Sequence, residues 1–247
     1  MIQVIHRAFN ILEFLAQDPT KEFSLSEIVD NTGLNPATCA NILKTMMNRN
    51  YVEQTGPKKG YQLSYMAYHL TQGVSYDTIL LNQTKSILHQ LRDDLNEGVL
   101  LSVLRGNKRV ILYEVPSTHE ILARARQEST AYRATTGRVI LANYTPQELD
   151  TFINQAGLPI PEEWPGIKTR EDLLAALEQI RQAGILVTVD QNHVAGVATP
   201  LLKNGMVIAS IGIYLPDIRF GLNERAFIIN QVKAVADQIN SLLNSHK

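Results

Sequence analysis

Two short helical patterns separated by a single glycine constrain the fold of this chain more than any other feature of its sequence. The first pattern begins at a serine that can cap a helix, Ser24 or Ser26, and ends at Gly33, which tolerates the left-handed conformation that stops a helix. The second begins at Asn35, whose side chain can bind free amides, and continues with Pro36, which has no amide to leave unpaired. Two helices in this order predict a helix-turn-helix unit.

The second helix, over residues 35–48, has two chemically different faces. Apolar residues recur at helical spacing on one face, at Cys39, Ile42, Leu43 and Met46. Small, amide and basic side chains occupy the opposite face, at Ala37, Thr38, Asn41, Lys44 and Asn48. An asparagine amide can pair with the edge of adenine, and threonine and lysine can reach phosphates or bases. The polar face therefore predicts a surface that enters the major groove of DNA.

A short β-hairpin is predicted directly after this helix. Residues 51–54 and 60–63 have the pattern of two strands joined by the polar turn TGPKKG, which carries Lys58 and Lys59. Two lysines at a hairpin tip suit contacts with phosphate, so the segment is typical of a winged helix-turn-helix. The predicted DNA-contacting residues are Ser24, Asn35, Ala37, Thr38, Asn41, Lys44, Lys58 and Lys59. The alternative, two packed helices that never touch nucleic acid, leaves the lysine tip and the polar face without a role.

Charge and composition limit the remaining classes. A net charge of -1 over 247 residues excludes a polycationic tail, and basic residues outnumber acidic ones locally, between residues 35 and 60. The single cysteine, Cys39, excludes a disulfide framework and a thiolate zinc cluster, and its place on the apolar stripe predicts a buried core residue. No apolar run has membrane-spanning length and no signal-peptide pattern opens the chain, so we expect a cytoplasmic protein.

The first helix is predicted ahead of the helix-turn-helix, over residues 4–15, and its leftover apolar residues Phe9 and Phe14 are candidates for contact with another subunit. A connecting helix is predicted beyond the hairpin, over residues 64–78. We take residues 1–63 as the winged helix-turn-helix domain and residues 79–247 as a second domain.

The second domain alternates between helices and apolar strands. A helix over residues 79–95 precedes a strand hairpin over 99–105 and 109–115, and a strand is expected at 121–125. Helices are predicted near residue 137 and from the caps Thr145 and Thr169. Three strands then follow over 185–190, 194–202 and 206–215, the last two joined by Asn204-Gly205, a strong hairpin signal. With a closing helix through about Leu243, the order predicts an α+β fold with an antiparallel sheet.

The whole chain resembles the IclR family of bacterial transcription regulators. The resemblance is carried by LSEIVDNTGLNPATCANILKTM with the following YVEQ and GYQL, by RATTGRVILA, by AGILVTVDQNHVAG, and by ATPLLKNGMVIASIGIYLP. It implies a GAF-like C-terminal antiparallel sheet with surrounding helices that binds a small organic acid or related metabolite. It also implies a homodimer or a dimer of dimers (a homotetramer) on a double-stranded DNA operator and, by family habit, a repressor.

Carried over position by position, the resemblance assigns six effector-binding residues. Thr135, Thr136 and Gly137 would form a helix start whose backbone amides hold an anion, as helix N-termini do. Asp190 matches an acidic position after a strand, and Gly212 and Tyr214 would face the pocket. The chain departs from the family's pattern at Arg133-Ala134-Thr135, where His-Ala-Thr is usual, and at Asn41, where many members have arginine. Neither the effector nor the operator sequence follows from the family.

Two other classes of function compete with this hypothesis. A metabolite-binding enzyme with a vestigial winged domain is one, and a winged domain used for protein contacts is the other. The six histidines show no metal-ligand spacing, and catalytic and phosphate-binding motifs are missing from the sequence, so it predicts no catalytic residue, metal or cofactor. His193 with Asp190 could form an acid-base pair or a structural hydrogen bond, and Arg124, Arg126 and Arg133 could line an anion site or be solvated. The predicted function is a ligand-responsive, DNA-binding transcription regulator.

Overall fold

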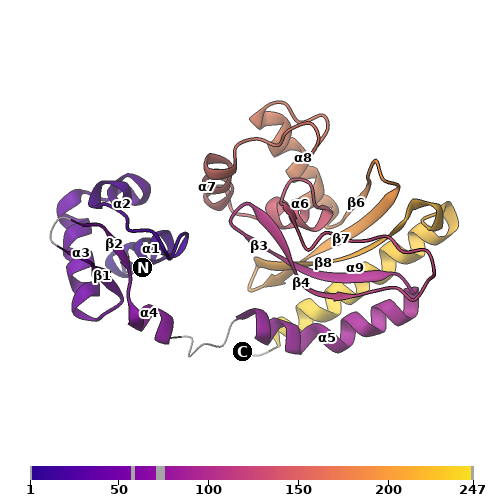
Figure 1. The fold of residues 1–247 in the computed structure, drawn as a ribbon, viewed down its shortest axis with the longest axis horizontal. Coiled ribbons are helices and arrows are strands. Elements are labelled where there is room, and N and C mark those ends of the chain that lie inside the picture. The colour runs from indigo at the N-terminus through magenta and orange to yellow at the C-terminus, as the bar shows by residue number, and fades with distance from the viewer. Residues whose placement is uncertain (1, 57–58, 71–75, 246–247) are drawn as a thin grey trace. The chain divides into compact units, whose positions relative to one another are not determined.

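The computed structural model describes residues 2–56, 59–70 and 76–245 (Figure 1). The chain divides into two compact units at the bond between Tyr76 and Asp77. In the described residues, none of the helices combines the length and the apolar character needed to cross a membrane.

In its described residues, the first unit has three helices, a two-stranded sheet and a short fourth helix. Its elements are α1 (Gln3–Ala16), α2 (Leu25–Thr32), α3 (Pro36–Asn48), β1 (Val52–Gln54), β2 (Tyr61–Leu63) and α4 (Tyr65–His69). β1 and β2 pair antiparallel, and Phe23 adds an isolated bridge to Tyr61. The predicted helix-turn-helix and its wing are therefore confirmed.

Local chemistry sets the ends of α2 and α3. Ser24, rather than Ser26, caps α2, and its hydroxyl accepts a hydrogen bond from the Glu27 amide while the Glu27 carboxylate accepts one from the Ser24 amide. Gly33 ends the helix in the left-handed conformation, at φ +66°. Asn35 caps α3 by accepting a hydrogen bond from the Thr38 amide at 2.8 Å.

A small apolar core holds the three helices together. Ile11, Leu15, Ile28, Cys39 and Leu43 are almost fully buried in it. Cys39 is thus a core residue, as predicted, and burial raises the pKa of its thiol.

The two phenylalanines of α1 differ in exposure. Phe9 is 56% exposed, whereas Phe14 is buried with its ring 4.7 Å from that of Phe23. The expectation that Phe14 is available to another subunit is therefore wrong, because its side chain fills the core of its own unit.

The second unit is built on a six-stranded antiparallel sheet in the order β5-β4-β3-β8-β7-β6. The strands are β3 (Gly98–Arg105), β4 (Lys108–Val115), β5 (Glu128–Thr130), β6 (Leu186–Val189), β7 (Val194–Lys203) and β8 (Met206–Pro216). The helices are α5 (Tyr76–Leu95), α6 (Thr135–Ala142), α7 (Pro146–Ala156), α8 (Arg170–Ala183) and α9 (Leu222–Asn244), with a 3-10 turn, η1 (Asp217–Arg219), before α9. The predicted α+β class is confirmed.

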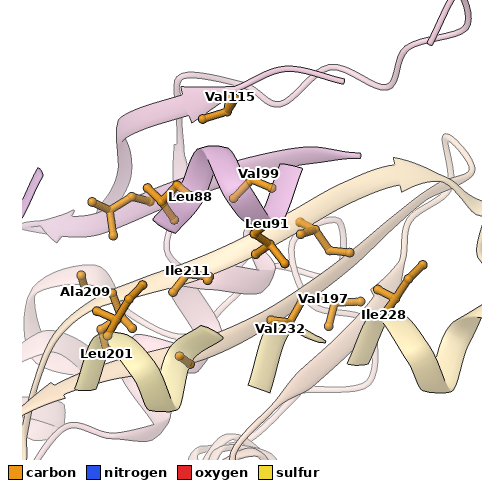
Figure 2. Close-up of a cluster of buried hydrophobic side chains, with 14 of the residues drawn as sticks. Leu88, Leu91, Val99, Val115, Val197, Leu201, Ala209, Ile211, Ile228 and Val232 are labelled. Carbon is orange, nitrogen blue, oxygen red and sulfur yellow. The ribbon is translucent and has the colours of Figure 1, made fainter. Parts of the chain in front are cut away.

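Two cores lie on opposite faces of this sheet. Side chains of α5 and α9 pack with those of β3, β7 and β8 on one face, where Leu88, Val99, Ile211 and Val232 gather in one cluster (Figure 2). The other core joins α6, α7 and α8, and α6 lies directly on the sheet (Figure 1). Each helix buries one apolar stripe, which is the layered arrangement expected for an α+β unit.

One predicted hairpin of this unit is confirmed, and one predicted strand is wrong. Asn204 and Gly205 both have positive φ, at +51° and +79°, which confirms the hairpin between β7 and β8. The strand expected at 121–125 is wrong, since the edge strand β5 lies further along the chain and pairs with β4. Ile121 is 75% exposed, so its apolar side chain does not mark a buried strand.

The connecting helix predicted over residues 64–78 falls partly outside the described residues, which omit 71–75. Within them, α4 ends at His69 and α5 begins at Tyr76. The predicted domain limits at 63 and 79 stay predictions.

Candidate functional site

The outward face of α3 is the candidate DNA-binding surface. Ala37, Asn41, Lys44 and Asn48 are exposed, and they follow one another at helical spacing along one side of the helix. The buried residues of α3 are the four that the apolar stripe predicted. Because Thr38 is only half-buried, it borders the exposed stripe. The structure thus presents a row of small, amide and basic side chains to solvent.

Ser24 and Asn35, two of the predicted DNA-contacting residues, are helix caps. Ser24 bonds to Glu27 through both its amide and its hydroxyl, and Asn35 bonds to the Thr38 amide. These bonds fix the start of each helix, so both residues position the exposed face of α3. Their direct contact with DNA stays a prediction.

The segment between β1 and β2 is described except for residues 57–58. Lys59 is exposed, its amide bonds to the Gly56 carbonyl at 3.0 Å, and its own carbonyl accepts a bond from the Gln54 side chain at 2.6 Å. The other predicted tip residue, Lys58, lies outside the described residues. Lys59 therefore sits on a backbone turn that is held by hydrogen bonds while its ammonium group is free to reach solvent.

A cavity of about 620 Å³ lies in the second unit, beside the first turn of α6. Leu100, Gly196, Val197 and Tyr214 of the sheet contribute to its lining, together with the segment 122–126. This volume is in the range of pockets that hold small organic ligands.

Four of the six predicted effector-binding residues line this cavity, namely Thr135, Thr136, Asp190 and Tyr214. Gly137 and Gly212 are not among its lining residues. A Cβ at Gly137 would overlap the Ala131 carbonyl, and one at Gly212 would lie 2.8 Å from the Thr136 methyl group. Gly212 lets α6 pack directly on the sheet, and Gly137 lets it pack against the turn at Ala131 after β5, so both glycines shape the cavity by packing.

The first turn of α6 has no side-chain cap. Its N-cap residue, Ala134, has no side chain that could bind the first amides of the helix. Thr135 lies beside these amides, and its hydroxyl is 2.6 Å from the hydroxyl of Thr188 on β6. Free amides together with the helix dipole make this turn attractive to an anion.

Asp190 and His193 do not form the acid-base pair that their spacing suggested. The Asp190 carboxylate accepts bonds from the amides of Asn192 and Val194, which folds the turn between β6 and β7. His193 instead places Nδ1 2.7 Å from the carboxylate of Asp217. Both side chains are engaged in structural bonds.

Tyr214 closes one end of the cavity. Its hydroxyl donates a hydrogen bond to the Glu114 carboxylate, and burial, together with this carboxylate, raises the pKa of the Tyr214 phenol well above its usual value. Arg124, Arg126 and Arg133, which sequence reasoning left open as anion ligands, all line the cavity and are exposed at its rim.

Sequence reasoning missed two further arginines of the cavity lining. Arg138 donates to the carbonyls of Tyr132 and Glu163 and stacks over the Trp164 ring, and burial lowers the pKa of Arg138 to about 10. Arg109 of β4 is 6% exposed, and its Nε and Nη1 have no hydrogen-bond partner. An arginine at the start of a strand is ordinarily solvated, so no sequence signal marked Arg109.

In the part of the chain that the structure describes, histidine, cysteine and carboxylate side chains form no group of three or more that could hold a metal ion. The polar residues of the cavity are mostly basic or hydroxyl-bearing, which suits binding of an anion. A helix-turn-helix with a polar outward face, in one chain with a ligand-sized cavity, defines the class of DNA-binding transcription regulators.

Comparison with known proteins specifies the family. The profile "IclR helix-turn-helix domain" matches residues 4–56, and "Bacterial transcriptional regulator IclR C-terminal" matches residues 74–241. The chain belongs to the IclR family of bacterial transcription regulators. This family consists of DNA-binding regulators, so the alternative of an enzyme is not favoured.

Relatives and solved structures agree with this assignment. The chain is similar to the HTH-type transcriptional regulator TtgV of Pseudomonas putida, with 28% identity over 222 residues, or 88% of this chain and 83% of TtgV. It is also similar to the transcriptional repressor IclR of Escherichia coli, with 22% identity over 64% of this chain and 58% of that protein.

Two solved structures resemble the whole chain. A transcriptional regulator from Rhodococcus sp. RHA1 is 25% identical, with a TM-score of 0.60 and 99% of each chain covered. An IclR homolog from Microbacterium hydrocarbonoxydans, solved in complex with 4-hydroxybenzoate, is 19% identical, with a TM-score of 0.59 over 97% of this chain and 98% of that one.

Proposed function

We propose that this protein is a homodimeric or homotetrameric repressor of the cytoplasm whose operator affinity is changed by a small organic acid. The observation that carries the proposal is the exposed row Ala37, Asn41, Lys44 and Asn48 on α3. This row carries the side-chain amides of Asn41 and Asn48 and the ammonium group of Lys44, which are suited to contacts in the major groove. Repression is supported by the similarity to a transcriptional repressor.

In this proposal, side chains of the first unit divide the work on DNA. Asn41 reads a base edge, Thr38 and Lys44 reach bases or phosphates, and Lys58 and Lys59 bind the flanking backbone. Ala37 leaves room for close approach of α3, while Ser24 and Asn35 fix the two helix starts near the phosphates. Because one winged unit offers few contacts, two copies are needed to read two half-sites.

The effector binds in the cavity of the second unit, with its carboxylate at the first turn of α6. The free amides of this turn, the hydroxyls of Thr135 and Thr136, and the arginines at the rim support an anionic ligand. Tyr214 and Asp190 border the bound molecule, and Gly137 and Gly212 allow the close packing of α6. A solved relative in complex with 4-hydroxybenzoate is consistent with an organic acid in this fold.

An effector changes DNA affinity only if it binds two states of the protein unequally. We propose that the effector-bound form holds the two winged units at a spacing that does not fit both half-sites. Binding of acid and binding of operator then oppose each other, and each weakens the other by the same factor.

The proposal is tested by selecting duplexes from random DNA with the purified full-length chain and then adding small organic acids. We expect a two-fold-symmetric site to be enriched and at least one acid to release it. Retention of no duplex, at low salt and with or without acids, would contradict the proposal. If symmetric DNA is enriched but no acid releases it, the result would support operator binding and contradict the proposed effector.

A further inference from the structure

Two charged side chains are buried among the described residues, and they differ in how they are neutralised. Glu97 accepts two hydrogen bonds from the Arg219 guanidinium, at 2.6 and 2.8 Å. Arg109 is as well buried, yet its Nε and Nη1 have no partner. Buried polar groups in folded proteins are almost always hydrogen-bonded, so an orphan guanidinium calls for an explanation.

The nearest carboxylate does not supply the missing bonds. Glu114 is close enough for its charge to favour the ionised form of Arg109, which opposes the lowering of the Arg109 pKa by burial. However, one oxygen of Glu114 accepts a bond from the Tyr214 hydroxyl and the other from the Gln127 amide at 3.1 Å. Each oxygen of Glu114 thus accepts a bond from another donor, while Nε and Nη1 of Arg109 are left without a partner in the cavity lining.

Arg109 and the first turn of α6 mark two different places in the cavity. Thr136 packs on Gly212 of β8, whereas Arg109 extends from β4, and β3 lies between these two strands. Gly212 pairs with Leu100 and Arg109 pairs with Leu104, four residues further along β3, so the two backbone positions are about 10 Å apart across the sheet and about 13 Å apart along it. A molecule bound to the α6 amides by one carboxylate needs a second group to reach Arg109.

The charge of the cavity indicates what this second group is. Five arginines line the cavity, against the acidic residues Glu162, Glu163 and Asp190. The Asp190 carboxylate is already bonded to two backbone amides. Hydrogen bonds between a guanidinium and an anion are about twice as strong as those between neutral groups, so an anion satisfies Arg109 better than a hydroxyl or carbonyl.

We propose that Arg109 binds a second carboxylate of the effector and that the cavity therefore selects dicarboxylic acids over monocarboxylic ones. This inference rests on the proposed binding of an organic acid at α6. Arg109 is then the residue that distinguishes the two classes of acid.

The test compares acids that differ only in the second carboxylate. The probes are succinate, glutarate, adipate and pimelate, each paired with butyrate, valerate, hexanoate or heptanoate of the same chain length. Their dissociation constants are measured by calorimetry on the full-length protein, on Arg109→Met and on Arg126→Met. Arg126 is the matched control, because it is an exposed arginine at the rim of the same cavity.

We expect at least one diacid to bind the unmodified protein about tenfold or more tightly than its monoacid, as charged hydrogen bonds allow. Arg109→Met should remove this preference and weaken diacid binding much more than monoacid binding. Arg126→Met should weaken both acids of a pair by a similar factor. Arg109→Gln, which keeps a polar side chain without the charge, should behave like Arg109→Met.

Folding does not confound this comparison. Methionine at position 109 removes an unpaired buried charge, so the melting temperature without ligand should be equal to or above that of the unmodified chain. A fall in the ligand-free melting temperature of both Arg109 variants would show that the guanidinium has a structural role in the fold, and would overturn the inference.

Other outcomes separate this inference from the proposed function. In one such outcome, monoacids bind the protein and cause it to release DNA, but diacids bind no better. In another, Arg109→Met keeps the preference for diacids. Either result would overturn the role of Arg109 and leave the proposed effector site standing. Failure of every acid both to bind and to release operator DNA would overturn the role of Arg109 together with the proposed effector site.

Discussion

Asn41 and Lys59 occupy different parts of the proposed DNA-binding surface, and their removal should have different effects. Asn41→Ala should relax base preference at one position of the half-site, at a cost of about 1–3 kcal/mol for the preferred base. Lys59→Ala should weaken all duplexes alike and reduce the slope of log affinity against log salt by about one unit. Fluorescence anisotropy on a set of operator variants measures both. Equal effects of both variants on every duplex would contradict this division of roles.

Glu27 should make the stability of the first unit depend on acid pH. Its hydrogen bonds with the Lys21 ammonium and with the amide and hydroxyl of Ser24 lower the pKa of Glu27 from 4.5 to about 2. Between these values the unfolded chain binds more protons than the folded chain, so stability rises with pH across this window and is lost as pH falls through about 2.

Glu27→Gln keeps the capping geometry and removes the charge, so it isolates this effect. The unmodified protein should melt at a higher temperature than Glu27→Gln above about pH 5, and the difference should vanish toward pH 2. The effect is small because the group is exposed to solvent. Melting followed by circular dichroism measures it, with Glu13→Gln on α1 as the control, and a difference independent of pH would contradict the assignment.

Single residues of the cavity were only partly predictable from the sequence. Thr135, Thr136, Asp190 and Tyr214 were assigned through resemblance to a family, and the structure places all four at the cavity. Arg109 could not be found this way, because its burial depends on the fold that covers β4. Desolvation is a property of the assembled unit, so no local pattern encodes it.

At the scale of secondary-structure elements, we expect the close packing of α6 to determine the shape of the cavity. Gly137→Ala would place a methyl group against the Ala131 backbone, with its Cα at 2.8 Å, so α6 must shift or the contact must strain. Such overpacking costs about 1–3 kcal/mol. We expect a lower melting temperature and a weaker response to effector, with DNA affinity retained.

The matched control for this element is Gly221→Ala, at the N-cap of α9, where a Cβ has no atom within 4 Å and φ is -66°. It should leave both the melting temperature and the effector response nearly unchanged. If the two variants behaved alike, the tight contact under α6 would not be what shapes the cavity.

Elements whose ends carry local signals were predicted well. The caps Ser24, Asn35, Thr145 and Thr169 bond to amides one turn ahead, and the structure shows all four bonds. The error at 121–125 has the opposite origin. β5 is a strand because it pairs with β4 across a long connection, and such pairing depends on the rest of the sheet rather than on the residues themselves.

For the whole molecule, we expect formation of the proposed dimer to depend on exposed apolar side chains at α1. Ile2, Val4, Ile5 and Phe9 expose large apolar side chains next to one another in the sequence. A charge in an apolar contact between two subunits is costly. Phe9→Glu should therefore reduce the dimer fraction in sedimentation equilibrium and lower operator affinity about tenfold or more, because two half-sites are no longer bound together.

Phe227→Glu on α9 is the control for this prediction, since Phe227 has a similar exposed fraction, 52% against 56% for Phe9. It should leave the dimer fraction and operator affinity close to those of the unmodified protein. A Phe9→Glu variant that stays dimeric and retains full affinity would place the subunit contact elsewhere.

The close seat of α6 has a consequence for how proteins of this type diverge. Gly137 accepts no larger side chain without movement of the backbone, and Gly212 accepts none without movement of the Thr136 side chain, so packing preserves the end of the cavity that suits a carboxylate. Arg124, Arg126 and Arg133, in contrast, are exposed and can be exchanged at little cost in stability. Relatives can therefore change their effector through mutations at the rim of the cavity, while the tightly packed first turn of α6 is retained.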